Sequence, residues 1–189
     1  DIPAYEEYAD ERPSGSGAEA GWYGIVEAER YAVKNDHAVR TTSVAEPYIS
    51  PDPKGRIVYN ALGGNDWSVP GESVSWAFDV PATGWYAIDM KYFQGYQGKA
   101  SAFRTIRIDG EIPFAEMRGY RFEPNRSFAI SPLSDAAGEP YLFHLTEGRH
   151  TLEMTADASA IQPVVQSLRH IGERLGAIEK DVRSITGNY

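Results

Sequence analysis

The sequence contains no cysteine, and its basic residues are few. Without cysteine the chain can form neither disulfide bonds nor thiolate metal sites, although secreted proteins can also lack cysteine, so this absence does not fix the compartment. Eighteen Lys and Arg stand against 27 Asp and Glu, which gives a formal net charge of −9. Nucleic acid binding needs clustered Lys and Arg to neutralise phosphates, and no such cluster occurs. We therefore expect no nucleic acid partner.

Long apolar runs and the common catalytic motifs are also missing. No apolar stretch approaches the roughly 20 residues that cross a bilayer, so we expect no membrane insertion. The sequence has no Walker loop and no dinucleotide fingerprint, and its four histidines are not spaced as a helix-borne metal site. We expect no signal peptide in the sequence, and because the chain does not start with Met, we expect a mature or excised fragment. These absences favour a non-catalytic domain.

Three regions follow one another along the chain. Residues 1–21 combine a short helical stretch with a linker rich in Ser and Gly. Residues 22–159 alternate short β-type runs with turn sequences such as GGND, VPGE, PATG and DG. Strands are expected at residues 22–33, 56–62, 73–80, 84–93, 103–112, 141–145 and 150–156. Several short strands without intervening helices predict a mostly β protein, a jelly-roll β-sandwich.

The third region, residues 160–187, has the pattern of one long helix. Apolar residues recur in alternating steps of four and three, which is the spacing of a heptad repeat. We call these residues the apolar seam: Val164, Leu168, Ile171, Leu175, Ile178, Val182 and Ile185. Either the seam packs on the module's own surface or its N-terminal helix, or it docks on an absent part of a parent protein or on another copy.

Two acidic residues, Glu27 and Glu29, lie in the first expected strand. Alternation along a strand points positions i and i+2 to the same face, so both carboxylates would point the same way. They could be a solvated face, a catalytic pair or part of a cation site. Glycosidase carboxylates flank a bond from opposite sides, so catalysis is the weakest of the three. Calcium takes several oxygen ligands, and Asp157 after the last strand is the candidate third side chain.

Aromatic residues in the loops indicate a second type of site. The chain has 12 Tyr, 4 Trp and 7 Phe, and several lie in Gly-rich segments rather than on alternating strands. Such rings stack on sugars while nearby polar groups bind the hydroxyls, or else they plug the end of a sandwich. The candidate carbohydrate-binding residues are Trp67, Tyr92, Tyr96, Arg104, Asn125, Arg126 and Phe128. By contrast, we expect Trp76, Trp85, Tyr86 and Phe143 to lie in the core.

Several motifs resemble the family 6 and family 35 carbohydrate-binding modules. The resemblance rests on VEAERY, on GGNDWSVPGESVSWAFDVPATGWYAIDMKY, on RIDG and on LTEGRHTLEM. It implies a galactose-binding-like sandwich with a structural calcium, whose ligands carry over to Glu27, Glu29 and Asp157. It also implies a sugar site in the loops at one end, with Trp67 as the stacking residue. Phe128 stands where these families often have Trp, and the usual Asn near the end is missing.

A longer stretch resembles the amino-terminal module of some Gram-positive solute-binding proteins of sugar ABC transporters. This similarity covers nearly the whole chain, including both helices, and it rests on the stretch from FRTIRIDG to LTEGRHTLEM and on the helix that ends in VRSITGNY. It implies an extracellular, cell-surface and lipid-anchored parent whose remaining domains would contact the helix. Our leading hypothesis is a non-catalytic carbohydrate-binding module that binds an oligosaccharide or polysaccharide. The alternative is a structural or interaction domain that docks through its C-terminal helix.

Overall fold

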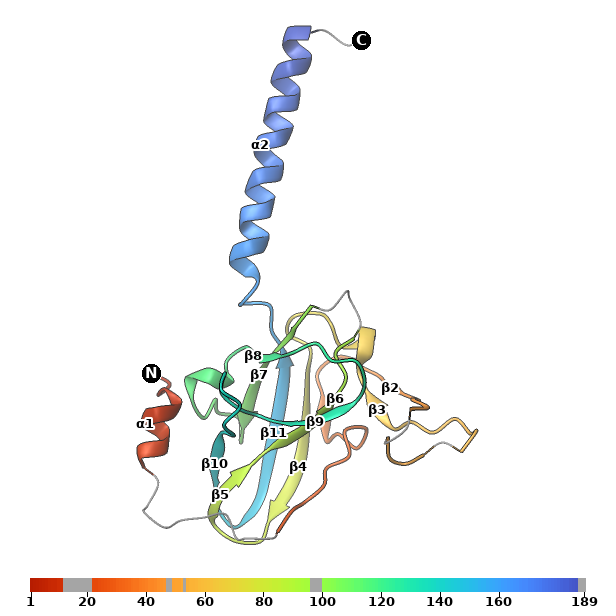
Figure 1. Cartoon of the computed structure of the whole chain (residues 1–189), viewed down its shortest axis with the longest axis vertical. Helices are drawn as coiled ribbons and strands as arrows, with labels where there is room; N and C mark the ends of the chain where they lie inside the picture. Colours follow the sequence, from red (N-terminus) through yellow and green to blue (C-terminus); the bar gives the residue numbers. More distant parts are fainter. Residues whose placement is uncertain (12–21, 47–48, 53, 96–99, 187–189) are drawn as a thin grey trace. The chain divides into compact units, whose positions relative to one another are not determined.

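The computed structural model describes residues 1–11, 22–46, 49–52, 54–95 and 100–186, with the side chains of residues 185 and 186 left out. The chain divides into two units, Asp1–Asp157 and Ala158–Tyr189. The first unit holds α1 (Tyr5–Asp10) and all the described strands, and the second holds α2 (Gln162–Thr186). The mostly β fold with a short N-terminal and a long C-terminal helix is therefore confirmed (Figure 1).

One layer of the first unit is a five-stranded antiparallel sheet in the order β1-β4-β11-β7-β8. Its strands are β1 (Val33–Lys34), β4 (Ser73–Val80), β7 (Ala102–Ile108), β8 (Tyr120–Phe122) and β11 (Gly148–Ala156). The centre is the long pair of β4 and β11, in which Leu152 lies opposite Trp76. In β4, Val74 and Trp76 are buried, as the period of two predicts.

A second layer lies over this sheet in two antiparallel pairs (Figure 1). β5 (Gly84–Ala87) pairs with β10 (Leu142–Leu145), and β6 (Asp89–Tyr92) pairs with β9 (Ala129–Pro132). Short elements complete the unit: β2 (Thr41–Thr42), β3 (Ala61–Leu62), and the 3₁₀ helices η1 (Gly64–Asp66) and η2 (Ala115–Met117). Residues from both layers form one buried cluster, which makes the unit a β-sandwich.

The core contains the aromatic residues that the sequence predicts. Trp76, Trp85, Tyr86 and Phe143 are all buried, as expected. Phe114, which precedes η2 and is fully buried, lies at the centre of an aromatic cluster, with ring centroids 5.3 Å from Phe143. Edge-to-face and tilted ring pairs of this kind add to the stabilisation that burial provides.

Helix α1 packs against the sandwich through two tyrosines. The ring of Tyr5 lies 4.8 Å from that of Phe114, and the ring of Tyr8 lies 5.3 Å from that of Trp85. Their hydroxyl oxygens accept hydrogen bonds from the backbone N–H groups of Leu142 (2.9 Å) and His144 (2.8 Å) in β10. These bonds pair amides of a strand edge that would otherwise face solvent. Helix α1 is thus an integral part of the first unit.

Two of the expected strands are wrong over most of their length. Of residues 22–33 only Val33 is in a strand, because the ladder with β4 is limited to Val33 and Lys34. The preceding segment is irregular, and Trp76 ties it to the sheet by donating from Nε1 to the Ala28 carbonyl at 2.9 Å. Of residues 56–62 only Ala61 and Leu62 pair, with β2.

Three short strands, β2, β8 and β9, were not expected from the sequence. β8 and β9 fall between residues 113 and 140, where no alternating pattern stands out. β8 exists because it pairs with the first residues of β7, with Phe122 opposite Ala102. β9 exists because it pairs with β6. Both depend on partners distant in sequence, so local pattern could not reveal them.

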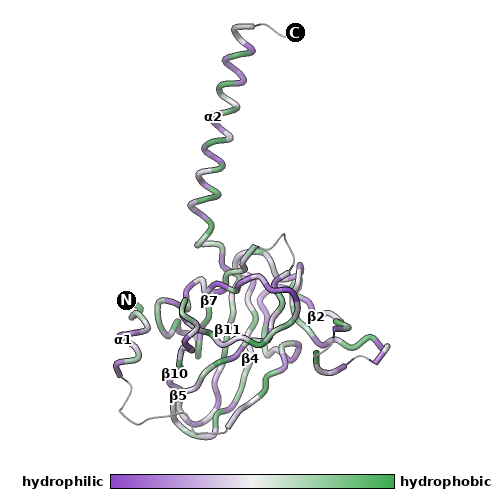
Figure 2. Tube along the Cα trace, in the orientation of Figure 1, coloured by the Kyte–Doolittle hydropathy of each residue, from purple (hydrophilic) through white to green (hydrophobic). Residues whose placement is uncertain are grey.

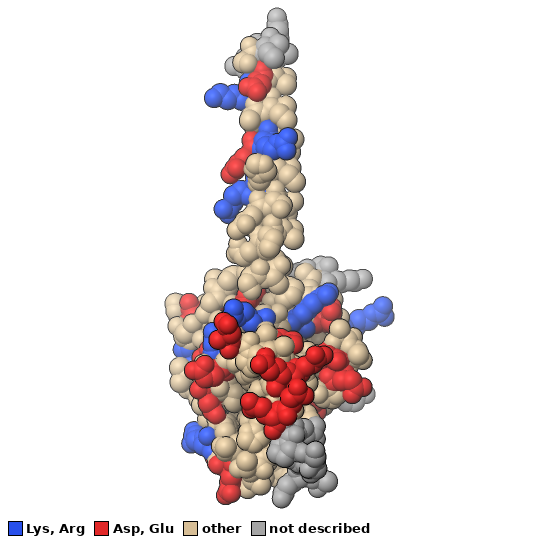
Figure 3. Space-filling view, turned by 90° about the vertical axis from the view of Figure 1, so that its left-hand side faces the viewer, with Lys and Arg blue, Asp and Glu red and all other residues tan. Residues whose placement is uncertain are grey.

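Acidic side chains gather on one face of the sandwich (Figure 3). Helix α1 lies on the side of the molecule that this view presents, and its residues Glu6, Glu7 and Asp10, with Glu11 after it, are exposed. Glu6 and Glu7 in the first turn also favour the helix, because carboxylates stabilise the positive end of its dipole. A surface of this charge repels polyanions.

The second unit is one helix of 25 residues. Pro163 lies in its first turn, as expected, where a missing N–H costs nothing. Hydrophobic and hydrophilic residues alternate along it (Figure 2). In the described residues no helix is long and apolar enough to cross a membrane.

Candidate functional site

The predicted carbohydrate-binding residues that the structure describes, all but Tyr96, lie around the end of the sandwich where β7 begins. We call this the loop-end site, and it consists of two groups. The first group is Trp67, after η1, with Arg104 on β7. The second is Tyr92 at the end of β6, with Asn125 and Phe128 in the segment between β8 and β9. The register joins them, because β8 pairs with Ala102, Phe103 and Arg104 at the start of β7.

Trp67 is half-buried, and backbone and side-chain contacts fix its ring. Its Nε1 donates to the Glu72 carbonyl at 3.1 Å, and its centroid lies 6.2 Å from that of Trp76. The guanidinium of Arg104 lies 4.7 Å from the Trp67 ring centroid and donates to the Trp67 carbonyl at 2.8 Å. The Trp67 ring therefore packs against the core and also has an exposed part.

Burial lowers the pKa of Arg104, and the charge of Glu72 opposes this effect. Glu72 is itself buried, and its carboxylate accepts a hydrogen bond from the Val69 N–H at 2.9 Å. A guanidinium remains charged despite such a shift because its ordinary pKa is far above neutrality. The first group thus places a fixed positive charge beside an indole ring.

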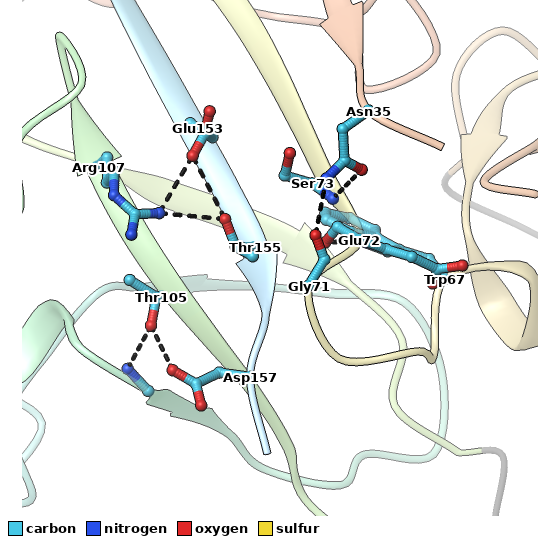
Figure 4. Close-up of polar contacts among 11 residues, drawn as sticks. Asn35, Trp67, Gly71, Glu72, Ser73, Thr105, Arg107, Glu153, Thr155 and Asp157 are labelled. Atoms are coloured by element: carbon cyan, nitrogen blue, oxygen red, sulfur yellow. Dashed lines mark hydrogen bonds and ion pairs between the residues drawn. The ribbon is translucent and has the colours of Figure 1, made fainter. Parts of the chain in front are cut away.

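The turn next to Trp67 is held by the side chain of Asn35, which directly follows β1 (Figure 4). The Asn35 side chain donates to the Gly71 carbonyl and accepts from the Ser73 N–H, both at 2.7 Å. Gly71 has a positive φ of 95°, a conformation that suits glycine. These bonds hold the segment from Trp67 to Ser73 in one conformation.

The second group is held by Asn125. Its side chain accepts from the Gln94 N–H at 2.8 Å and donates to the Tyr92 carbonyl at 3.0 Å. The first bond uses one of the two acceptor positions on the amide oxygen, and the second uses one of the two hydrogens on the amide nitrogen. Asn125 thus orders the end of β6, which is a structural role that the sequence did not predict for it.

Two half-buried rings, Phe93 and Phe128, form the aromatic part of the second group. Their centroids lie 5.7 Å apart. Tyr92 turns the other way, with its ring 5.1 Å from that of Phe122 and its hydroxyl donating to the Glu123 carbonyl at 3.2 Å. Arg126 is exposed. Phe93 was missed by the sequence reasoning, although Tyr92 and Phe93 are adjacent, so only one of them could face the core.

Tyr96 lies outside the described residues. Of the other six candidates, Arg104 and Trp67 contact each other, and Tyr92 and Asn125 are hydrogen bonded. Tyr92 and Trp67 both pack against the core and are partly exposed, while Phe93 and Phe128 are half-buried in the second group. The loop-end site can therefore offer apolar ring surface together with the Arg126 and Arg104 guanidinium groups.

The three candidate calcium ligands are placed differently from the expectation. Glu27 and Glu29 lie in irregular chain rather than on a strand, and the Glu27 carbonyl closes a turn with the Arg30 N–H at 2.9 Å. Strand alternation therefore does not orient them. Asp157 follows β11, and its carboxylate accepts a hydrogen bond from the Thr105 hydroxyl (Figure 4).

Asp157 also has backbone and neighbour contacts that order the end of β11. Its N–H donates to the Phe103 carbonyl at 3.0 Å. Among the described residues, no group of three or more acidic or histidine side chains is placed to hold a metal ion. Calcium stays a prediction from the sequence.

Comparison with known proteins yields a similarity to a solved structure. No family model and no curated protein matches the chain. Four chains of solved structures match, among them a Paenibacillus sp. cycloisomaltooligosaccharide glucanotransferase complexed with cycloisomaltoheptaose. The identity is 20%, the TM-score is 0.48, and the match covers 71% of this chain and 16% of that one. A likeness of this strength carries no argument about function.

Proposed function

We propose that the chain is a non-catalytic carbohydrate-binding module that binds an oligosaccharide or polysaccharide at the loop-end site. The observation that carries the proposal is the set of partly exposed rings, Trp67, Phe93 and Phe128, in loops at one end of a β-sandwich. Pyranose rings have apolar faces that stack on such side chains, and the exposed guanidinium of Arg126 can donate hydrogen bonds to hydroxyl groups.

Preorganisation supports this proposal. The hydrogen bonds of the Asn35 and Asn125 side chains order the two loops before any ligand binds. A ligand that binds ordered loops loses less free energy to immobilising them. The extracellular location and the solute-binding parent remain predictions that rest on the resemblance of the sequence.

The test is isothermal titration of the full chain with a panel of α-glucans, β-glucans, xylans and galactans. Phe128→Ala should weaken binding roughly twofold to tenfold, which is the range expected for one stacking contact. Ile130→Ala is the matched control, because Ile130 is exposed on β9 two residues away. The control should bind like the parent.

Two outcomes would contradict the proposal. Absence of binding to every polysaccharide in the panel would remove the sugar-binding function. Release of reducing ends from a bound polysaccharide, abolished by Glu27→Gln, would instead make the chain an enzyme.

A second candidate function is an interaction domain that docks through α2. The observation that favours it is the exposure of the apolar seam, whose described members from Val164 to Val182 are 51 to 63% exposed. Sedimentation with the remaining domains of a parent protein tests this candidate.

A further inference from the structure

The apolar seam of α2 has the pattern of a coiled-coil core. With Leu168 at position a, the a positions hold Leu168, Leu175 and Val182, and the d positions hold Val164, Ile171 and Ile178. Every one of these six side chains is apolar, and each is more than half exposed. Unlike a membrane span, which is apolar all round, α2 has charged residues on its other faces, so its apolar surface is one stripe.

We propose that this stripe binds other copies of the same chain, forming a parallel coiled coil of about three or four helices. The choice of partner rests on the charges that flank the stripe. Arg174 is at a g position, and Glu179 is at the e position of the next heptad. In a parallel assembly these two positions face each other on adjacent helices, so Arg174 of one copy meets Glu179 of its neighbour.

The other flanking positions are compatible with the same arrangement. The g positions Ser167 and Asp181 face the e positions Gly172 and Thr186, so no like-charged pair arises. In a fully overlapped antiparallel pair, g faces g, and Arg174 of one copy would lie beside Arg174 of the other. The charge pattern therefore favours the parallel direction.

The next observation concerns the contacts that Arg174 and Glu179 form within a single α2 helix. Glu179 forms an ion pair with Arg183 one turn later, at 2.5 Å, and Arg183 is at a b position farther from the stripe. In the assembly the Glu179 carboxylate would be shared between Arg183 and the Arg174 of the neighbouring copy. Arg174 is exposed and forms no ion pair within the part of α2 that the structure describes. It is thus able to bind a carboxylate on another copy.

The number of copies follows from the shapes of the core residues. The two central heptads have Leu at a (Leu168, Leu175) and Ile at d (Ile171, Ile178). Leu at a with Ile at d favours three or four strands over two, because β-branched side chains pack differently at the two layers. Such an assembly would present several loop-end sites at once, but it does not depend on sugar binding.

The first experiment is sedimentation equilibrium of the full chain over a wide range of concentrations. The expected result is a trimer or tetramer that dissociates on dilution. Leu175→Lys should yield a monomer, because it places a charge in the core, whereas the matched control Ala177→Lys, on the outer face of the helix, should assemble like the parent.

Circular dichroism and thermal unfolding of the sandwich show whether Leu175→Lys remains folded. A monomeric parent at every concentration would overturn the proposal, and so would a complex that Leu175→Lys leaves intact. A dimer would overturn the assigned number of copies. A parent that is monomeric alone but binds the remaining domains of a larger protein would assign the stripe to that partner instead.

The second experiment determines whether the helices are parallel or antiparallel. Because the chain has no cysteine of its own, any disulfide must come from the introduced residues. Val164→Cys and Val182→Cys are made separately, mixed and oxidised. A parallel assembly predicts disulfides between identical variants, because equivalent layers meet. Predominant formation of mixed disulfides between the two variants would show an antiparallel pair and overturn the proposal.

Discussion

The sandwich and α2 satisfy their apolar residues in different ways. In the sandwich, Phe114, Phe143 and Ile106 are fully or almost fully buried by residues distant in sequence. In α2, an equally regular apolar pattern is exposed from Val164 to Val182. The sandwich is therefore stabilised by contacts among its own buried residues. The exposed stripe of α2, by contrast, has the composition of a binding surface.

The largest expected effect tests the self-sufficiency of the sandwich. Phe114→Ala should lower the free energy of unfolding by about 3 to 5 kcal/mol, because it leaves a cavity at the centre of the aromatic cluster. Guanidinium unfolding followed by tryptophan fluorescence measures it. Tyr59→Ala removes an exposed ring and serves as the control, with a much smaller expected change.

The comparison would fail if Phe114→Ala and Tyr59→Ala cost the same. Equal costs would mean that the buried cluster is no better packed than the surface. The Leu175→Lys variant extends the test, because the midpoint of the sandwich should not change when the stripe of α2 is altered.

The next effect concerns α1, which packs against the sandwich through Tyr5 and Tyr8; the linker expected after it lies outside the described residues. Tyr5→Phe and Tyr8→Phe each remove one hydrogen bond to β10 while keeping the ring, and each should cost about 0.5 to 1.5 kcal/mol. Hydrogen exchange at the Leu142 and His144 amides should become faster in the respective variants. Tyr59→Phe is the control, and unchanged exchange at both amides would contradict the proposed role of α1.

A smaller effect concerns the pH dependence of the sandwich. His150 is buried in β11, and its ring nitrogens lie 2.6 Å from an Asp109 carboxylate oxygen and 2.7 Å from the Thr146 carbonyl oxygen. Burial alone would lower the pKa of His150, but the bonds to Thr146 and Asp109 outweigh it, and the pKa is raised. Burial of Asp109 likewise opposes its bonds to His150 and Thr151, which lower the pKa of its carboxyl.

The direction in which each pKa shift changes stability with pH follows from the linkage between proton binding and folding. The contribution of His150 is fully present below its ordinary pKa of about 6.5 and is lost as pH rises through the raised value. The contribution of Asp109 is present above its ordinary value of about 3.9 and is lost as pH falls through the lowered one. Stability should therefore decline on the alkaline side of about pH 6.5, and His150→Gln should flatten that decline. An unchanged pH profile in His150→Gln would refute this account.

The smallest expected effect is that of calcium. If Glu27 and Glu29 take part in a calcium site, calcium should raise the midpoint of thermal unfolding, and Glu27→Gln with Glu29→Gln should abolish the increase. Glu6→Gln with Glu7→Gln, on α1, gives a control of equal charge change. A midpoint that does not respond to calcium would make the pair an ordinary solvated segment.

The sequence predicted the identity of many residues of the loop-end site, but little of how these residues contact one another. The turn sequences around Trp67 and Asn125 indicated loops with polar and aromatic residues. The sequence could not show that the Asn125 amide would be used to hold Gln94 and Tyr92. It also could not show that Arg104 would lie on the Trp67 ring, since these residues are 37 positions apart.

The sequence by itself determined the strands whose pattern is local and the helix whose period is regular. β4 matches its expected range, and α2 lies within residues 160–187, because alternation and heptad spacing are properties of neighbouring residues. Only the tertiary structure decided that VEAERY is not a strand and that β8 and β9 are. A strand requires hydrogen bonds to a partner, and the ladder of β1 ends after two residues while β7 and β6 provide partners for β8 and β9.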